Sequence, residues 1–376
     1  MPLLIKDVIS RIESIIPLYL QEEWDNSGYQ IKSSNNPVSG IVTSLDLTTG
    51  CSKLAVNNGA NLIFTHHPPF FNPVEMINLE SPTGKIAGFL SGMNVCVYSL
   101  HTNFDSSIYG MSRFIGLKIG IKDLIPIANK KRKLFKLSVF IPEGHVEKVR
   151  DALFASVRPV IGNYENCSYE VKGRGSFKPL SGAKPFIGSK GKTSFVDESR
   201  LELLVPEEKL EDAIKELKRV HPYEEVAFDV YTLHDSGGNN KEGHGVMGDM
   251  DPAIKFSELL GVIQKSLNPS YINYTGDLKR RVKRIGIVAG SGFSFVDEAF
   301  RKGCDALISS ELKHSEALKA VEYRICLASL SHFDTEKYFT GILKDILLKE
   351  FKGIGIFENK EKGPVFTYNK YKEAQV

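Results

Sequence analysis

The chain contains 376 residues, which is enough for two or three domains of ordinary size. Hydrophobic residues make up 42% and charged residues 25%, values typical of a globular protein, so disordered and fibrous classes are excluded. The 48 basic and 45 acidic residues give a formal net charge of +3. That excess is too small to predict a surface for duplex nucleic acid.

Segments for membrane insertion or export are not expected. The longest apolar stretches, such as residues 61–64, are far shorter than the roughly 18 residues of a membrane-spanning helix. Residues 1–20 are apolar at helical spacing, but charged residues interrupt them and argue against a signal peptide. The cysteines are scattered and form no Cys-x-x-Cys pair, which predicts reduced thiols in a cytoplasmic protein. They are Cys51, Cys96, Cys167, Cys304 and Cys326.

Strand and helix signals alternate in the first part of the chain. Residues 41–45, 61–65 and 95–99 are short apolar strands, separated by helices over 48–58 and from Ser81-Pro82 to about Gly92. Continuously apolar strands that alternate with helices predict a parallel sheet covered on both faces.

The same alternation returns after about residue 280. It predicts strands at 284–289, 306–308 and 325–328, and helices at 295–302, 311–321 and 334–349. Residues 59–63 resemble 303–307, and 95–101 resemble 325–331, so the two blocks are either diverged copies or similar by chance. If they are copies, two similar α/β halves face each other, with a site where their strand ends converge.

The middle of the chain has a different pattern. An alternating strand at 134–141, helices at 145–157 and 207–219, and strands at 200–205 and 226–231 are typical of a ferredoxin-like α+β domain. The Gly/Asn-rich residues 235–245 look like a return linker. We therefore predict an α/β domain with mainly parallel strands, in two halves at 1–129 and 236–376, interrupted by an inserted α+β domain at 130–235.

Histidines and carboxylates gather where predicted strands end. His66 and His67 lie between a buried strand and Pro68-Pro69, which forces the strand to stop. Ligands collect at the carboxyl ends of parallel strands, so these imidazoles are well placed for a metal ion. The alternative is a pair of histidines in an ordinary turn.

Two further clusters also follow strands, at 101–105 (HTNFD) and 332–336 (HFDTE). The i, i+4 spacing of His332 and Glu336 can place imidazole and carboxylate on one face of a helical turn. Three such clusters together predict a metal site. Histidine and carboxylate ligands without cysteine suit Zn, Mn, Fe, Co or Ni, and a carboxylate can bridge two ions.

Other motifs carry weaker signals. We expect Ser310 and Glu311 to start a helix, and His314 to contact the metal ligands from outside or to line a pocket wall rather than bind metal. The turn at 290–292 (GSG) hints at a phosphate-accepting helix N-terminus but lacks a P-loop lysine. His221, in the segment 221–225 (HPYEE), is expected to be structural.

Several motifs together resemble one family. The matching segments are 23–28 (EWDNSG), 44–48 (SLDLT), 65–70 (THHPPF), 99–105 (SLHTNFD) and 331–336 (SHFDTE). They are similar to those of the dinuclear-metal proteins named GTP cyclohydrolase I type 2 homologues, also called NGG-one-interacting-factor-like proteins. The middle segment resembles the PII-like insert of the longer bacterial members through 175–179 (GSFKP), Gly182-Ala183 and 221–225.

The resemblance implies a site and an assembly. It makes two divalent ions per chain the expected cofactors, with zinc favoured, and Glu336 the expected bridge; the expected ligands are His66, His67, Asp105, His332 and Glu336. It also implies a homohexamer. Two departures leave substrate preference open: Ser331-His332 stands where many members have Gly-His, and 309–311 (SSE) where many have Thr-Gly-Glu.

Three functional hypotheses follow. The first is a metal-dependent hydrolase that opens the imidazole ring of a purine nucleotide such as GTP and releases formate, with His101 or Glu336 shuttling protons. The second keeps the metal pair but cleaves phosphoesters. The third is a non-catalytic, metal-binding regulatory assembly.

Overall fold

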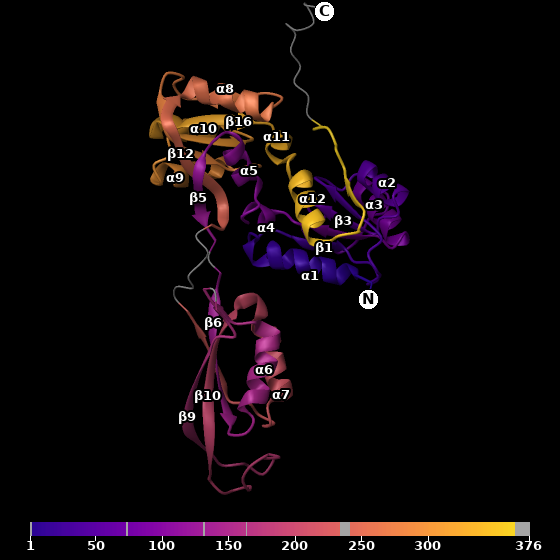
Figure 1. Cartoon of the computed structure of the whole chain (residues 1–376), viewed down its shortest axis with the longest axis vertical. Coiled ribbons are helices and arrows are strands. Elements are labelled where there is room, and N and C mark those ends of the chain that lie inside the picture. The colour runs from indigo at the N-terminus through magenta and orange to yellow at the C-terminus, as the bar shows by residue number, and fades with distance from the viewer. Residues whose placement is uncertain (1, 73, 131, 163, 234–240, 365–376) are drawn as a thin grey trace, which may run out of the picture. The chain divides into compact units, whose positions relative to one another are not determined.

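The computed structural model describes residues 2–72, 74–130, 132–162, 164–233 and 241–364. The chain forms two compact units (Figure 1). One consists of Met1–Lys130 with Asn239–Val376, and the other of Lys131–Gly238. No helix within the described ranges is both long and apolar enough to cross a bilayer.

The first sheet of the larger unit has five strands in the order β1-β4-β3-β2-β17. Strands β2, β3 and β4 run parallel to one another and β17 parallel to β2, whereas β1 pairs antiparallel with β4. Their bounds are β1 (Gly28–Ile31), β2 (Ile41–Ser44), β3 (Leu62–Thr65), β4 (Cys96–Ser99) and β17 (Ile356–Glu358). The prediction of short, buried parallel strands is confirmed here.

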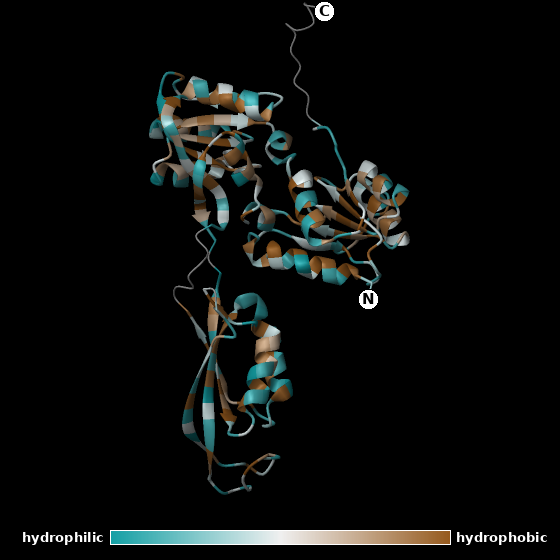
Figure 2. Cartoon of the chain, in the orientation of Figure 1, coloured by the Kyte–Doolittle hydropathy of each residue, from teal (hydrophilic) through white to brown (hydrophobic). Residues whose placement is uncertain are grey.

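Helices cover both faces of this sheet, which explains its uninterrupted apolar strands. Val42, Ile63 and Val97 pack with residues of α2 and α3. Alternate residues such as Leu62 and Phe64 join a second cluster that contains α1 and α12. The helix bounds are α1 (Ile5–Ile15), α2 (Thr49–Asn57), α3 (Pro82–Gly92) and α12 (Phe339–Glu350). Figure 2 shows the alternation of hydrophobic and hydrophilic residues along α1.

The second sheet of the larger unit has six strands in the order β13-β16-β15-β14-β12-β5. Its centre, β14-β15-β16, is parallel, and the remaining pairs are antiparallel. The strands are β5 (Lys122–Asn129), β12 (Gly243–Lys255), β13 (Asn273–Thr275), β14 (Arg281–Ile287), β15 (Ala306–Ser310) and β16 (Cys326–Leu330). The helices that accompany it are α5 (Met111–Lys118), α8 (Phe256–Leu267), α9 (Val296–Arg301) and α10 (His314–Tyr323).

The expected return linker at 235–245 is wrong at its end, because β12 already begins at Gly243. Residues 234–240 lie outside the described part of the chain. The glycines that suggested a loop instead permit close packing in the sheet. A Cβ on Gly243 would collide with the Ala128 carbonyl oxygen, and one on Gly245 would lie 2.7 Å from the Val288 side chain.

The smaller unit contains an antiparallel sheet in the order β11-β6-β10-β9. Its buried residues, such as Leu137 and Leu201, pack against α6 and α7. The elements are β6 (Leu134–Pro142), α6 (Val146–Val157), β9 (Ser168–Phe177), β10 (Ser194–Pro206), α7 (Leu210–Val220) and β11 (Phe228–Thr232), with a small hairpin of β7 (Val160–Ile161) and β8 (Tyr164–Glu165). The main elements therefore follow a β-α-β-β-α-β order.

Short helices complete the chain: α4 (Thr102–Asp105), α11 (His332–Glu336), and the 3₁₀ helices Leu18–Leu20, Glu207–Lys209 and Phe293–Phe295. One apolar cluster extends through both sheets of the larger unit. Phe104 and Phe339 belong to it, with ring centroids 4.8 Å apart, and His66 lies 5.0 Å from the Phe339 ring. The polar site described next is therefore built on this core.

Candidate metal centre

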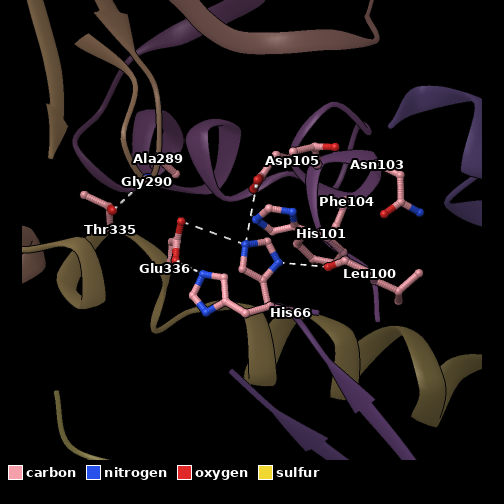
Figure 3. Close-up of polar contacts among 12 residues, drawn as sticks. His66, Leu100, His101, Asn103, Phe104, Asp105, Ala289, Gly290, Thr335 and Glu336 are labelled. Carbon is pink, nitrogen blue, oxygen red and sulfur yellow. Dashed lines mark hydrogen bonds and ion pairs between the residues drawn. The ribbon is translucent and has the colours of Figure 1, made fainter. Parts of the chain in front are cut away.

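Four histidines meet where strands of the two sheets end. His66 and His67 follow β3, His101 follows β4, and His332 begins α11 directly after β16. The ring of His66 lies 4.9 Å from that of His67 and 5.0 Å from that of His101. The His67 ring is 5.6 Å from both the His101 and His332 rings. Figure 3 shows His66 and His101 together with Asp105 and Glu336.

All four rings are held by the same type of contact. Each Nδ1 lies close to an oxygen: that of His66 to the Leu100 carbonyl (2.8 Å), of His67 to Asp46 (2.8 Å), of His101 to Asp25 (2.7 Å) and of His332 to Glu311 (3.1 Å). An Nδ1–H that donates to such an acceptor leaves the Nε2 lone pair free. Metal-binding histidines are commonly oriented in this way.

Glu336 lies between these imidazoles and is buried. Its Oε2 is 3.0 Å from His67 Nε2 and 2.9 Å from His332 Nε2. Its other oxygen, Oε1, is 3.9 Å from His66 Nε2, and Asp105 Oδ2 is 3.7 Å from that same nitrogen (Figure 3). The two carboxylate oxygens of Glu336 therefore face different histidines.

The donor atoms fit a metal ion. Within the described ranges, the buried atoms of this cluster that lack a hydrogen-bond partner include His66 Nε2 and Asp105 Oδ1. Buried polar atoms without partners are costly in a folded protein, and a cation satisfies such lone pairs. Two ligands about 2.0–2.2 Å from one ion lie about 3–3.5 Å apart, close to the separations of Glu336 Oε2 from His67 and His332.

Two overlapping groups of donors have ligand atoms within 4.8 Å of one another. One comprises His66, His67 and His101, and the other His67, His332 and Glu336. The cluster contains imidazole and carboxylate and no thiolate, a donor set that suits a divalent transition metal. The predicted metal-site residues are thus gathered in one place.

The ionisable groups of this cluster are buried, and they shift one another's pKa values. Burial opposes ionisation of Glu336, but contact with His332 and His67 holds its pKa well below the usual range. Burial and the charge of Glu336 raise the pKa of Asp105 well above its ordinary value. Burial opposes protonation of His67 as well, yet Asp46 and Glu336 raise its pKa to about 10.

The glycine turn at 290–292 does not form the phosphate cradle that the sequence suggested. The Gly290 amide donates to Thr335 Oγ1 (3.0 Å; Figure 3) and the Gly292 amide to Ser309 Oγ (2.8 Å). Gly290 has a φ of +68°, and a Cβ there would collide with Glu336 Oε1. This glycine is needed because the carboxylate approaches its backbone closely.

The expected helix start at Ser310 and Glu311 is also wrong. Ser310 ends β15, and α10 begins at His314, which is exposed. Glu311 instead adopts a φ of +60° and contacts His332. A left-handed backbone is unfavourable for a residue with a Cβ, so this strained conformation is retained where it orients a candidate ligand.

A cavity of about 840 Å³ lies beside His67 and His332. Its volume is in the range of small-molecule sites. The wall includes the apolar side chains Leu45, Tyr271 and Phe333 and the charged Asp46, Glu311 and Lys362. His314, for which a pocket wall was one of the two expected positions, does not line this cavity.

Asp25, Asp46 and Glu311, which hold histidine rings, were not predicted to have this role. Asp25 accepts hydrogen bonds from Ser27 Oγ (2.9 Å) and the Thr102 amide (3.1 Å). Although burial opposes its ionisation, contact with His101 and hydrogen bonds from the Thr102 and Ser27 hydroxyls hold the pKa of Asp25 far below the ordinary value. The signal was available, since all three acids lie in segments singled out in the sequence: 23–28, 44–48 and 309–311.

His221 in the smaller unit has the structural role expected of it. Its Nε2–H donates to the Phe140 carbonyl (3.1 Å), and its Nδ1 accepts from the Tyr223 amide (3.1 Å). Both nitrogens of this ring are therefore used within the fold.

An α/β protein with a histidine–carboxylate cluster that could hold a metal ion is the class that these observations define. The model of the family Duf34/NIF3 (NGG1p interacting factor 3) matches residues 3–363, and the chain belongs to this family. It is 30% identical over 366 residues to the GTP cyclohydrolase 1 type 2 homolog of Staphylococcus epidermidis, covering 96% of each chain. The homolog of Staphylococcus aureus is 30% identical over 347 residues, covering 92% of this chain and 93% of the relative.

A solved structure agrees with the fold over nearly the whole chain. The crystal structure of a Bacillus cereus protein related to NIF3 superposes with a TM-score of 0.77 at 27% identity. The match covers 97% of this chain and 99% of that one.

Proposed function

We propose that the protein is a hydrolase that uses a pair of divalent metal ions. The observation that carries this proposal is the position of Glu336, whose Oε2 faces His67 and His332 while its Oε1 faces His66. His66 and Asp105 would hold one ion, and His67 and His332 the other, with His101 close to the first ion but not bound to it. Glu336 would bridge the two ions, and zinc is the first candidate for both.

The bound ions would supply a polarising charge and lower the pKa of coordinated water to about 7. The protein's own residues orient the reactants and move protons. Asp25 fixes the ring of His101 through Nδ1 at 2.7 Å, which leaves Nε2 to accept or deliver a proton. Glu336 is the second candidate for proton transfer.

The names of the relatives make GTP the first substrate to test. Water would add to C8 of the purine, the imidazole ring would open, and a second water would release C8 as formate. The assay measures formate and the ring-opened product after incubation of GTP with protein loaded with Zn, Mn, Fe, Co or Ni. We expect turnover by the parent and by His314→Ala, and loss in His332→Ala. Absence of formate with every metal would contradict this substrate.

Phosphoester hydrolysis is the second enzymatic candidate, because paired metal ions commonly clamp phosphoryl groups. It is less well supported, since the amides of Gly290 and Gly292 are already used within the protein. Release of phosphate from generic phosphoesters, without formate from GTP, would favour this reaction.

A regulatory assembly is the alternative from another class. In this proposal the chain forms a homohexamer in the cytoplasm and the smaller unit is a PII-like module for assembly or sensing. The Lys130 amide lies 3.2 Å from the Glu242 carbonyl oxygen, so a short linker can replace the smaller unit. The shortened chain should keep its metal and lose assembly mass by light scattering. Catalysis by the full chain would argue against a purely regulatory role.

A further inference from the structure

An exposed pair of aromatic rings lies beside the candidate metal centre. Trp24 is 60% exposed and Phe71 is 42% exposed, yet their rings stack with centroids 5.8 Å apart and planes inclined by 12°. Large aromatic surfaces left in water forgo the free energy that burial would provide. Such a pair is therefore a candidate for contact with a ligand.

Both rings contact a residue of the site itself. The Trp24 ring meets that of His101 edge-on at 6.1 Å and 75°, and the Phe71 ring does so at 5.4 Å and 79°. His101 in turn lies 5.0 Å from the His66 ring. A molecule stacked against the pair is therefore one side chain away from the metal-binding histidines.

The chain holds the two rings in place through their neighbours. Asp25, next to Trp24, contacts His101 Nδ1 at 2.7 Å. Asn26 donates from Nδ2 to the Phe70 carbonyl at 2.6 Å, which ties the Trp24 segment to the residue before Phe71. The segment that carries Trp24 thus both orients His101, through Asp25, and is tied to the segment that carries Phe71, through Asn26. A surface organised in this way before binding loses little freedom when it takes a ligand.

Another stacked pair provides a comparison. Phe300 and Tyr323 stack with centroids 4.2 Å apart, and Phe300 is 45% exposed. The Tyr323 hydroxyl donates to Asp297 at 2.8 Å, so that pair braces α9 against α10. It does not contact the histidine cluster and serves as a matched control.

We propose that Trp24 and Phe71 are a stacking platform for a planar heteroaromatic ring of the substrate. This inference rests on the proposed function, because the platform would present that ring to the metal centre of a hydrolase. Stacking on an aromatic side chain is tolerant of ring identity and is lost when the side chain is truncated. The platform would hold the ring, and the centre would act on it.

Trp24 is the sole tryptophan of the chain, so its fluorescence reports directly on this surface. Zinc-loaded full-length protein is titrated with guanosine, adenosine, a pterin and inorganic tripolyphosphate. We expect the planar compounds to quench the fluorescence and tripolyphosphate to leave it unchanged. Quenching by none of the planar compounds would overturn the proposal, as would an equal response to tripolyphosphate.

Calorimetry then measures the contribution of the ring to affinity. Trp24→Ala should weaken binding of the best planar compound by about tenfold or more, Trp24→Phe should restore most of it, and Phe300→Ala should match the parent. An unchanged affinity in Trp24→Ala would contradict the platform. A changed assembly mass in this variant would also contradict it, because the surface would then be an interface between protein chains. The binding measurement does not depend on turnover. If planar compounds bind but none is hydrolysed, the proposed hydrolase function is rejected and the platform is retained.

Discussion

His332 Nε2 and Glu336 Oε2 lie 2.9 Å apart across one turn of α11. The helix begins immediately after β16, with Ser331 as its N-cap; the Ser331 side chain accepts a hydrogen bond from the Asp334 amide (3.1 Å). The cap starts the helix at His332. Because residues i and i+4 share a helical face, His332 and Glu336 then point to the same side. A short helix after one strand thus supplies an imidazole and a carboxylate together.

Substitution of Glu336 tests the bridging role. Glu336→Gln keeps the size of the side chain but removes its charge, and the amide nitrogen cannot act as a ligand oxygen does. We expect loss of both ions, whereas His332→Ala should mainly remove one. Elemental analysis of each variant measures the difference, with the exposed Glu322→Gln as control. Two ions retained by Glu336→Gln would rule out the bridge.

The residues that hold histidine rings should affect metal affinity without touching the metal. Asp46→Asn removes the charge behind His67 while preserving the shape of the side chain. Loss of such an outer contact typically weakens metal binding by about 10–100-fold, and competition with a chelator measures it. Glu311→Gln should act similarly through His332. The exposed Asp7→Asn should have no effect, and an equal loss there would point to a general effect of charge.

Alanine substitutions at Gly290 and Gly303 distinguish the effect of backbone strain from the effect of crowding at the site. Both have positive φ, +68° and +73°, but only at Gly290 would a Cβ meet Glu336, and at Gly303 nothing lies within 4 Å. Gly303→Ala should lower the free energy of unfolding by about 1–2 kcal/mol and keep the metal. Gly290→Ala should also displace Glu336 and lose metal. Normal metal content in Gly290→Ala would contradict the close approach described above.

The raised pKa of His67 predicts a specific pH dependence for protein stripped of metal by a chelator. Burial disfavours the imidazolium, but Asp46 and Glu336 raise its pKa to about 10, against about 6.5 in an unfolded chain. Because the folded protein holds this proton more tightly than the unfolded chain, protonation of His67 contributes to the free energy of unfolding. The contribution is complete below about pH 6.5 and is lost as the pH rises toward 10. Denaturant midpoints across this range should therefore fall.

His67→Asn should flatten that decline, and the exposed His314→Asn should not. The same pKa implies that metal binding at neutral pH displaces a proton from His67. Calorimetric titrations in buffers of different ionisation enthalpy measure the proton released. A binding enthalpy independent of buffer would contradict a protonated His67.

Local sequence patterns predicted those parts of the fold that depend on local packing. The strand predicted at 61–65 is observed at Leu62–Thr65, and that at 95–99 at Cys96–Ser99, because both are buried on two faces and read as apolar runs. Pairing of β17 with β2 joins segments about 300 residues apart, which no local pattern encodes. Strand β12 was missed because glycine is common both in loops and in strands that pack closely, so its presence did not distinguish the two.

Local sequence patterns likewise predicted some residues of the candidate site and not others. His66, His67 and His332 could be singled out because each directly follows a strand that the sequence reveals. The contacts of Asp25 with His101 and of Glu311 with His332 span 76 and 21 residues, so spacing gave no indication of them. Glu311 was misread as a helix-start acid, because a positive φ at a non-glycine residue leaves no trace in composition.

Elemental analysis of the gently purified protein, with the metal-to-chain ratio as its result, tests the central claim most directly. The convergence of four imidazoles, Asp105 and Glu336 predicts a ratio near two, falling toward zero in Glu336→Gln and remaining near two in Glu322→Gln. A ratio near zero for the parent, not restored by incubation with Zn, Mn, Fe, Co or Ni, would contradict the dinuclear centre.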